Sequence, residues 1–535
     1  MTIRGVHSSL DPSSRLNGGF LTVADAAGSA AADASAIAAG IPSRALMQRA
    51  GAAAAAEIAT RFADHLPDGV VVACGAGNNG GDGWVIARAL RAVGVPVRVV
   101  ECASASTPDA KAERALAIAD GVRVDASSAA LLTGGEHIAV DALLGTGYSS
   151  STPLREGILE PLAYMRALAT RGASVIAIDV PSGLDATTGV NAGSLFCSTT
   201  LTFGTIKRGH LLARDACGRI VLLDIGLGEH TRGAGSMRLT DARWFHAALP
   251  RIESDAHKGT RKKVAIIGGA QGMAGAVMLA ARAALRSGAG MVKCIVAGES
   301  LLALQQGEPA ALSSEWPESA QAFIDQVPAW ADAVLIGPGL GRARAREFVE
   351  LALAHFPGPV VLDADALNAF TGDAAGLGAL IGAREALLTP HPLEFARLSG
   401  MDRRDVLAQR FDAPLTLARR VGATVLLKGT PTVIATPSGE TTVVAEGTPV
   451  LATGGSGDVL GGIAVTLLAQ TGNALVAGSL AAFAHGRAAS TLSLRQVRGY
   501  TLDDVLESLP HVWSLLPATP RPPVLAEFPT HWEGE

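Results

Sequence analysis

A glycine-rich stretch near the C-terminus carries residue types suited to chemistry on a phosphate. Residues 453–458 read Thr-Gly-Gly-Ser-Gly-Asp, and an apolar helical run follows. Glycine has no Cβ, so such a turn approaches a ligand closely, and the N–H groups at a helix N-terminus bind anions. Asp458 would repel a phosphate there unless it takes a proton, which makes it a candidate general base. The alternative is a tight turn in which Asp458 caps the helix.

A second glycine-rich turn lies in the N-terminal half. Residues 70–74 form an apolar run, and residues 75–83 then read Gly-Ala-Gly-Asn-Asn-Gly-Gly-Asp-Gly before a helical segment. With the next apolar run at 95–100, this makes a βαβ unit of the Rossmann type. The polar clusters at 141–147 and 179–182 also follow apolar runs. Ligands of doubly wound sheets bind beyond the carboxyl ends of the strands, so we expect these clusters to form one site.

Asp179 is the candidate for acid–base chemistry in this half, because it ends a strand on the ligand side. A partly buried carboxylate there can move a proton near neutral pH. The alternative is a turn or capping residue before Pro181. Asn79, Asp141 and Ser182 offer oxygen ligands of the kind that hard cations take, although a plain hydrogen-bond network would use the same atoms.

The C-terminal half repeats the alternation of strands and helices with different loops. Polar clusters again follow apolar runs, at residues 337–341, 363–368, 390–394 and 428–432. We therefore expect an α/β protein of two domains, at residues 20–230 and 250–516, each with its site at the carboxyl ends of parallel strands. We expect residues 226–255 to form a linker with some local structure, and the Pro-rich tail after Leu516 to be loose.

The composition excludes several classes of protein. The chain has 535 residues, enough for about two to four domains, and is 48% apolar and 17% charged, as globular proteins are. The net charge is -5 without a basic block, so we expect no nucleic-acid partner. No apolar run reaches the ~18 residues of a membrane span, so we expect no membrane partner. Five scattered cysteines without a CxxC pair indicate a reducing compartment, and we expect a cytoplasmic protein.

Taken together, the motifs resemble those of the bifunctional NAD(P)H-hydrate repair enzymes. In chain order they are GxGNNGGDG, DVPSGLD, GPGLG, DADALN, LTPHPxE, KG and TGGSGD, and they span nearly the whole sequence. The first domain is similar to the Rossmann-like epimerase domain of that family. The second is similar to its ADP-dependent dehydratase domain, a relative of the ribokinase-like kinases. One departure is the stretch 446–452, where many relatives have an Asn-Pro-Gly-type turn, and this puts a contact near the nucleotide in doubt.

The resemblance implies the substrates and the cofactors. An epimerase would interconvert the R and S forms of NADH or NADPH hydrated at the nicotinamide ring. A dehydratase would restore NAD(P)H from the S form with ADP as co-substrate, giving AMP and phosphate. The family further implies K⁺ in the epimerase domain, held by Asn79, Asp141 and Ser182, and Mg²⁺ in the dehydratase domain. Asp363 and Asp365 are acids that could lie near Mg²⁺, although helix capping also accounts for Asp365.

The resemblance also assigns binding roles, with Asp179 and Asp458 as the catalytic residues. In the epimerase domain the residues expected to bind the hydrate are Asn78, Asn79, Gly80, Gly81, Asp82, Gly145, Thr146, Gly147, Tyr148 and Ser149. In the dehydratase domain they are Ala289, Gly339, His391 and Asp458, and the residues expected to bind the nucleotide are Lys428, Gly429, Thr430, Pro431, Thr432 and Gly457.

Two other functions remain open at this point. The TGGSGD loop fits a ribokinase-like small-molecule kinase with a fused nucleotide-sensing domain equally well. A scaffold whose first domain binds partners is the non-enzymatic alternative, and the intact acids at both sites count against it. We also expect a homo-oligomer.

Overall fold

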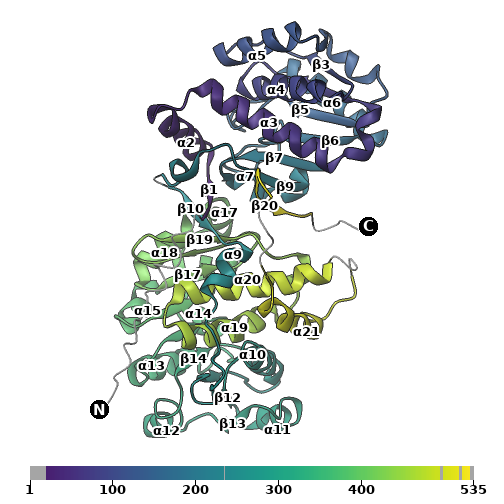
Figure 1. Ribbon diagram of the computed structural model, residues 1–535. Helices are drawn as coiled ribbons and strands as arrows, with labels where there is room; N and C mark the ends of the chain where they lie inside the picture. The colour runs from purple at the N-terminus through teal and green to yellow at the C-terminus, as the bar shows by residue number, and fades with distance from the viewer. Residues whose placement is uncertain (1–19, 234, 494–497, 517–520, 531–535) are drawn as a thin grey trace, which may run out of the picture. The chain divides into compact units, whose positions relative to one another are not determined.

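The chain folds into two compact units (Figure 1). The computed structural model describes residues 20–233, 235–493, 498–516 and 521–530. The N-terminal unit comprises Leu21–Met237 together with Thr519–Glu533, and the C-terminal unit is built on Arg238–Ala518. The last described residues, 521–530, thus belong to the N-terminal unit.

The N-terminal unit is a doubly wound sheet of the order β20-β9-β7-β6-β5-β2-β3-β4. All of its pairs are parallel except β20 with β9. Its strands are β2 (Val70–Cys74), β3 (Val97–Glu101), β4 (Arg123–Asp125), β5 (Ile138–Ala142), β6 (Ser174–Ile178), β7 (Thr199–Phe203), β9 (Arg219–Leu223) and β20 (Val524–Phe528), and β1 (Leu21–Ala24) pairs with β8 (Ile206–Lys207) beside them. Its helices are α2 (Ala26–Ala38), α3 (Ser43–Arg61), η1 (Ala63–Asp68), α4 (Asn78–Ala92), α5 (Pro108–Ala119), η2 (Ser128–Leu132), α6 (Glu156–Thr170), α7 (Arg208–Leu212), α8 (Arg214–Cys217) and η3 (Gly228–Thr231).

Alternate residues of the central strands enter two hydrophobic cores, one on each face of this sheet. Val70 and Val72 of β2 pack with α3 and α4, whereas Val71 packs with α6. Because both faces are covered, these strands are apolar without alternation, which is why the sequence shows them as short unbroken runs. The predicted strand at 70–74 is confirmed to the residue.

The C-terminal unit is a second three-layer α/β structure, with the strand order β13-β12-β11-β14-β15-β16-β17-β18-β19-β10. Its strands are β10 (Met237–Leu239), β11 (Lys263–Ile267), β12 (Met291–Val296), β13 (Leu312–Glu315), β14 (Ala333–Ile336), β15 (Val360–Leu362), β16 (Ala386–Leu388), β17 (Thr424–Leu427), β18 (Thr432–Ala435) and β19 (Thr441–Val444). The pairs from β13 to β17 are parallel, and β18 is antiparallel to both of its neighbours.

Helices cover both faces of this sheet, each over its own core. The helices of one face include α9 (Ala242–Ala248), α10 (Ala274–Arg286), α19 (Ser456–Thr471), α20 (Ala474–Ser493) and α21 (Leu502–Trp513). Those of the other include α12 (Ala320–Gln326), α13 (Ala345–His355), α14 (Asp365–Asn368), α15 (Ala374–Ile381), α16 (Pro392–Ser399), α17 (Arg403–Ala408) and α18 (Ala413–Val421). The remaining elements are α11 (Gly298–Gly307) and η4 (Pro449–Leu451). Small residues allow the closest approaches: a Cβ on Gly462 of α19 would lie 2.1 Å from the Ala280 carbonyl oxygen of α10.

The expected linker and the expected tail both contain defined elements. The predicted linker contains β10 and α9, and Phe245 of α9 is buried and stacks on Phe483 with ring centroids 4.7 Å apart. The prediction of a loose tail is wrong for residues 521–530, because β20 pairs with β9. Apolar and polar residues alternate too weakly in β20 for the sequence to indicate a strand. Among the described residues, no helix is both long and apolar enough to cross a membrane.

Candidate active sites

Three of the predicted residues of the N-terminal unit meet around the backbone of Leu144. The fully buried Asp141, in β5, accepts hydrogen bonds from the Ser182 hydroxyl (2.6 Å) and the Ser182 N–H (2.9 Å). The Ser182 hydroxyl also accepts from the Leu144 N–H at 2.9 Å, and the Asn79 side-chain amide donates to the Leu144 carbonyl at 2.7 Å. The neighbouring strands β2, β5 and β6 bring these residues together at their carboxyl ends.

This cluster suits a hard cation. Within the described part of the chain, Oδ1 of Asn79 is buried and has no hydrogen-bond partner. A buried oxygen acceptor without a donor is rare unless another ligand satisfies it. Carboxylate, hydroxyl and amide oxygens are the ligands that hard cations take, so the residues present fit K⁺. Burial raises the pKa of Asp141 despite the hydrogen bonds from Ser182, and a cation would lower it again.

The turn at the start of α4 requires its glycines. A Cβ on Gly80 would lie 2.0 Å from the Gly75 carbonyl oxygen, and one on Gly81 would lie 2.5 Å from Cε of Met47 in α3. Asn78 is the exposed first residue of α4, and Asp82 is half-buried one turn later. No side chain caps the N-terminus of this helix, and backbone N–H groups at a helix N-terminus suit an anion.

Residues 145–149 form the loop after β5. Gly145 lies against Asn79, since a Cβ there would be 3.3 Å from Cβ of Asn79. Thr146 is half-buried, and Gly147 and Ser149 are exposed. The Tyr148 hydroxyl is buried and, among the described residues, has no hydrogen-bond partner. Asp185, the last residue of the DVPSGLD motif, accepts hydrogen bonds from the backbone and the hydroxyl of Ser150 and so holds the end of this loop.

Asp179 lies in a polar cluster that the sequence reasoning did not anticipate. Its Oδ1 accepts hydrogen bonds from Nζ of Lys207 (2.5 Å) and from the Thr202 hydroxyl (3.1 Å), and Lys207 is buried. The His210 ring accepts from the Lys207 N–H through Nδ1, so its Nε2–H donates to the Asp179 carbonyl at 2.8 Å. Asp179 has φ +65°, a left-handed conformation that is strained for a residue other than glycine. The surrounding hydrogen bonds hold it there.

The electrostatics of this cluster separate two aspartates. Burial alone would raise the pKa of Asp179, but the charge of Lys207 and the hydrogen bonds from Lys207 and Thr202 hold it below its ordinary value. Burial, and then the negative charge of Asp179, raise the pKa of Asp82 well above its ordinary value. Burial also lowers the pKa of His210 to about 3, so this ring is neutral. The site therefore combines a carboxylate whose pKa is lowered with a carboxyl group whose pKa is raised, the kind of pair that takes base and acid roles.

The site of the C-terminal unit lies at the start of α19. Nζ of Lys428 is 2.7 Å from Oδ1 of the buried Asp363, and a Cβ on Gly457 would lie only 3.0 Å from that ammonium group. Gly455, with φ +92°, is the N-cap of α19. The half-buried Asp458 carboxylate makes no hydrogen bond to any described residue, so the interpretation of Asp458 as a helix cap is wrong.

A surplus of negative charge surrounds Lys428. Burial, and then Asp363, raise the pKa of Asp458 to about 7, although Lys428 opposes the shift. Burial likewise raises the pKa of Glu394 to about 7, again against Lys428. Asp365 adds to both shifts, and its Oδ2 accepts a hydrogen bond from the Gly341 N–H at 2.9 Å, in the loop after β14. This is not the helix capping that the sequence allowed, because Ala364 is the N-cap of α14 and no side chain caps that helix. Hard carboxylate oxygens in excess of the local positive charge fit Mg²⁺.

The predicted nucleotide loop is fixed by a residue that the sequence reasoning missed. Nη1 of the buried Arg410 donates to the carbonyls of Lys428 and Pro431, both at 3.2 Å. Gly429 has φ +152°, and a Cβ there would lie 2.0 Å from Nη1 of Arg410. Thr430 is exposed, whereas the hydroxyl of Thr432 donates to the Gly429 carbonyl at 3.0 Å. The Arg410 side chain thus supports the loop from Lys428 to Pro431, and Thr432 is held by its hydrogen bond to Gly429.

His391 and Gly339 lie at the carboxyl ends of β16 and β14, as predicted. His391 is the N-cap of α16, where its Nδ1 accepts from the Leu393 N–H at 3.1 Å and its own N–H donates to Glu394 at 2.9 Å. Gly339 has φ +54°, and a Cβ there would lie 3.1 Å from Cβ of Ala276. Ala289, in contrast, is buried in the core just before β12. It therefore lies at the amino end of a strand, and the structure does not bring it to the other predicted residues.

The strand-end rule points to the missed residues as well. Lys207 and His210 follow β7 after a Gly-Thr turn, as Asp179 follows β6. Arg410 carried no such signal, because it comes from the segment between α17 and α18 and reaches its loop only in the folded chain.

Both units thus carry a half-buried aspartate beside a lysine at the carboxyl ends of parallel strands, which defines a two-domain α/β enzyme. The family described as YjeF-related protein N-terminus matches residues 43–209, and the family described as NAD(P)H-hydrate dehydratase matches residues 264–511. A bifunctional NAD(P)H-hydrate repair enzyme of Salinibacter ruber is 36% identical over 516 residues, covering 88% of this chain and 92% of that protein. That of Escherichia coli is 34% identical over 481 residues, covering 87% and 89%. The chain belongs to the family of bifunctional NAD(P)H-hydrate repair enzymes.

Among solved structures, the chain is similar to an ADP/ATP-dependent NAD(P)H-hydrate dehydratase from Bacillus subtilis that was co-crystallized with ATP and Mg²⁺. The identity is 27%, the TM-score is 0.45, and the match covers 51% of this chain and 96% of that one. Because the curated relatives match across both halves, the alternatives of a kinase with a sensing domain and of a scaffold are not supported.

Proposed function

We propose that the N-terminal unit epimerises hydrated NADH or NADPH and that the C-terminal unit dehydrates the S form with ADP. The observation that carries the proposal is the Asp458 carboxyl, half-buried without a hydrogen bond to any described residue, beside the Lys428–Asp363 ion pair at the start of α19. A group with a pKa of about 7 in that place is suited to take a proton near neutral pH.

In the C-terminal unit Asp458 takes the proton of the C6 hydroxyl of the hydrate. The C6 oxygen then attacks the β-phosphorus of ADP, and AMP leaves. The C6–O bond of the resulting phosphate ester breaks as a proton leaves C5, which restores the ring double bond and releases phosphate. Lys428 and the N–H groups of residues 454–457 hold the phosphates, and the loop 428–432 holds the rest of the nucleotide. Asp363 and Asp365 would hold Mg²⁺, which screens phosphate charge when bound.

In the N-terminal unit the first turn of α4 and the loop 145–149 bind the hydrate. The ionised Asp179 takes the proton of the C6 hydroxyl while Asp82 gives its proton to the ring nitrogen, so that the C6–N1 bond breaks and C6 becomes an aldehyde carbon. The nitrogen then closes the ring on either face of C6 as the two protons return. Lys207 keeps Asp179 ionised, and His210 and Thr202 fix its orientation. Asn79, Asp141 and Ser182 would hold K⁺, whose charge favours a bound phosphate.

The test uses the intact chain and a mixture of R and S hydrates of NADH. With ADP present, reduced-nicotinamide absorbance should recover fully, through both forms. Asp179→Asn should leave the R form to its slow spontaneous epimerisation while the S form is consumed normally. Full consumption of both forms at the wild-type rate by Asp179→Asn would overturn the assignment of the epimerase site. We also expect a homo-oligomer in the cytoplasm, which gel filtration and fractionation would check.

A further inference from the structure

The last described residues of the chain form a built contact with the N-terminal unit. β20 runs antiparallel to β9 with Val524 opposite Leu223, Ala526 opposite Leu222, Glu527 opposite Val221 and Phe528 opposite Ile220. The Asp224 N–H extends the ladder by donating to the Pro523 carbonyl at 2.8 Å. The contact therefore spans β9 over most of its length.

Without β20, the strand β9 would be the edge of this sheet. Residues 220–223 are all fully buried, so β9 is apolar on both of its faces. An apolar edge strand with unpaired N–H and C=O groups is a template for aggregation, and proteins cover such edges. β20 does this and is itself bounded by Pro523 and Pro529, which cannot donate to a further strand.

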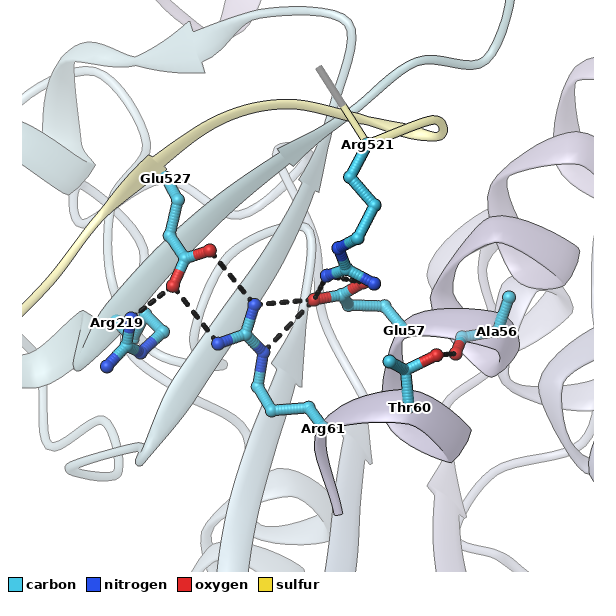
Figure 2. A network of polar contacts seen from close by, with 7 residues as sticks. All are labelled: Ala56, Glu57, Thr60, Arg61, Arg219, Arg521 and Glu527. Carbon is cyan, nitrogen blue, oxygen red and sulfur yellow. Dashed lines mark hydrogen bonds and ion pairs between the residues drawn. The ribbon is translucent and has the colours of Figure 1, made fainter. Parts of the chain in front are cut away.

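A network of charged side chains holds this segment to α3 (Figure 2). Nη2 of Arg521 lies 2.8 Å from both carboxylate oxygens of Glu57, which is 1% exposed. Arg61 of α3 bridges the two carboxylates: it lies 2.5 Å from Glu57, and 3.0 and 3.1 Å from the two oxygens of Glu527. Arg219 of β9 pairs with the same Glu527. The buried Glu57 is therefore paired with two arginines, Arg61 and Arg521. Glu527 is likewise paired with two, Arg61 and Arg219.

Helix α3 connects this network to the epimerase site. Gly51 of α3 packs so closely on α4 that a Cβ there would lie 2.4 Å from Cβ of Val85 and 3.0 Å from the Asp82 carbonyl oxygen. Met47 of α3 packs against Gly81 in the first turn of α4, within the motif predicted to bind the hydrate. A displacement of α3 would therefore displace the first turn of α4, because close-packed interiors transmit such shifts.

We propose that residues 521–530 are a docked strand of the N-terminal unit, supplied by the same chain, and that they position α3 and through it the first turn of α4 for epimerisation. The dehydratase unit of this chain thus carries, at its end, a segment that completes the epimerase unit. The mode is strand addition to a sheet edge, with main-chain hydrogen bonds for affinity and the charge pairs for register.

The test reverses the charges of the segment in the full chain, as the double variant Arg521→Glu/Glu527→Arg. This variant keeps the composition and the net charge but places like charges against Glu57, Arg61 and Arg219. We expect hydrogen exchange of the amides of β9 and α3 to become at least tenfold faster, and the epimerase rate to fall by tenfold or more. The dehydratase rate of the same molecule should not change, which shows that the chain has folded. The matched control is Arg346→Glu/Glu350→Arg, which reverses an exposed pair of the C-terminal unit at 2.8 Å and should change neither readout.

The hydrogen-exchange arm does not depend on the proposed epimerase activity, although the rate arm rests on it. Fast exchange of β9 in the wild-type chain, or unchanged protection of β9 in the charge-reversed variant, would overturn the docking. Lost protection with an unchanged epimerase rate would overturn the positioning role, provided that Asp179→Asn abolishes the rate. Gel filtration is the last arm: a dimer that the charge reversal converts into a monomer would show that a second copy supplies the strand.

Discussion

The ammonium group of Lys207 lies 2.5 Å from the Asp179 carboxylate, and Lys207 is buried while the Asp179 side chain is only 16% exposed. The pair joins the end of β6 to the segment after β7 and holds Asp179 in a left-handed backbone conformation. Removing one member of such a buried pair leaves the other charge without compensation. The relationship therefore bears both on the stability of the N-terminal unit and on the protonation of its proposed base.

Lys207→Met should abolish most epimerisation and destabilise the N-terminal unit by about 3–5 kcal/mol. Without the lysine charge, burial would raise the pKa of Asp179, so the acidic limb of the pH–rate profile should move to higher pH in any remaining activity. Thermal melting and a pH profile of epimerisation check both effects. Lys111→Met, at an exposed position of α5, is the matched control and should change neither. A Lys207→Met enzyme with a wild-type pH profile would show that this lysine does not set the protonation of Asp179.

Asp179→Asn and Asp82→Asn should separate the two carboxyl roles. Each substitution should lower the epimerase rate by about 10²–10⁴. They should differ in stability: Asp179→Asn leaves the Lys207 charge without its partner, whereas Asp82→Asn removes a carboxyl group that is costly to ionise in the folded state. Near pH 8 the melting temperature of Asp179→Asn is therefore expected to be lower than that of the wild type, and that of Asp82→Asn to be equal or higher. The opposite order of melting temperatures would contradict the protonation states inferred for the pair.

The sequence indicates which residues lie at the strand ends. It indicates much less about residues that reach a site or a sheet edge from elsewhere in the folded chain. Asn79, Asp141 and Ser182 could be placed together in advance because parallel strands bring their carboxyl ends to one edge. Arg410 could not, because its role depends on the path of a side chain between helices. The pairing of β20 with β9 was equally out of reach: it joins residues about 300 positions apart through main-chain hydrogen bonds, which leave no periodic pattern. Ala289 was placed by resemblance alone, and the strand-end rule would have argued against it.

Arg410→Lys should weaken ADP binding while leaving the catalytic step of bound ADP largely intact. Lysine keeps the charge, but its ammonium group lacks the fixed planar geometry with which the Arg410 guanidinium donates to both the Lys428 and the Pro431 carbonyls. The loop 428–432 should therefore lose its support. Loss of charge-assisted hydrogen bonds of about 1.5–3 kcal/mol corresponds to a rise of roughly 10- to 100-fold in the KM for ADP. Steady-state kinetics with saturating S hydrate separate KM from kcat. A fall in kcat at unchanged KM would show that Arg410 does not act through the nucleotide loop.

The pH dependence of Asp458 provides a test in which stability and activity change in opposite directions. Its pKa is raised to about 7 in the folded chain, from 3.8 in the ordinary state. Between these values the folded state binds more protons than the unfolded state, so stability falls as the pH rises from about 4 through 7. The base form needed for turnover appears over the upper part of the same range. Dehydratase activity should therefore rise with pH through about 7 while the melting temperature of the C-terminal unit falls.

Asp458→Ala should lower dehydratase turnover by roughly 10²–10⁴. The melting temperature of this variant should fall less steeply between pH 5 and pH 8 than that of the wild type. Some fall should remain, because Glu394, whose pKa is also about 7, still titrates in this range. ADP binding should survive, because Lys428 and the N–H groups of the turn remain, and it should tighten because a carboxylate beside the phosphates is gone. Two unit charges ~5 Å apart at an effective dielectric of about 20 repel by about 3 kcal/mol before salt screening. Calorimetric ADP titration, melting curves from pH 5 to pH 8 and a turnover assay on this one variant measure the three quantities. Near-normal turnover in Asp458→Ala would remove Asp458 from the chemistry, and Glu394, whose carboxylate accepts a hydrogen bond from the His391 N–H, would become the next candidate base.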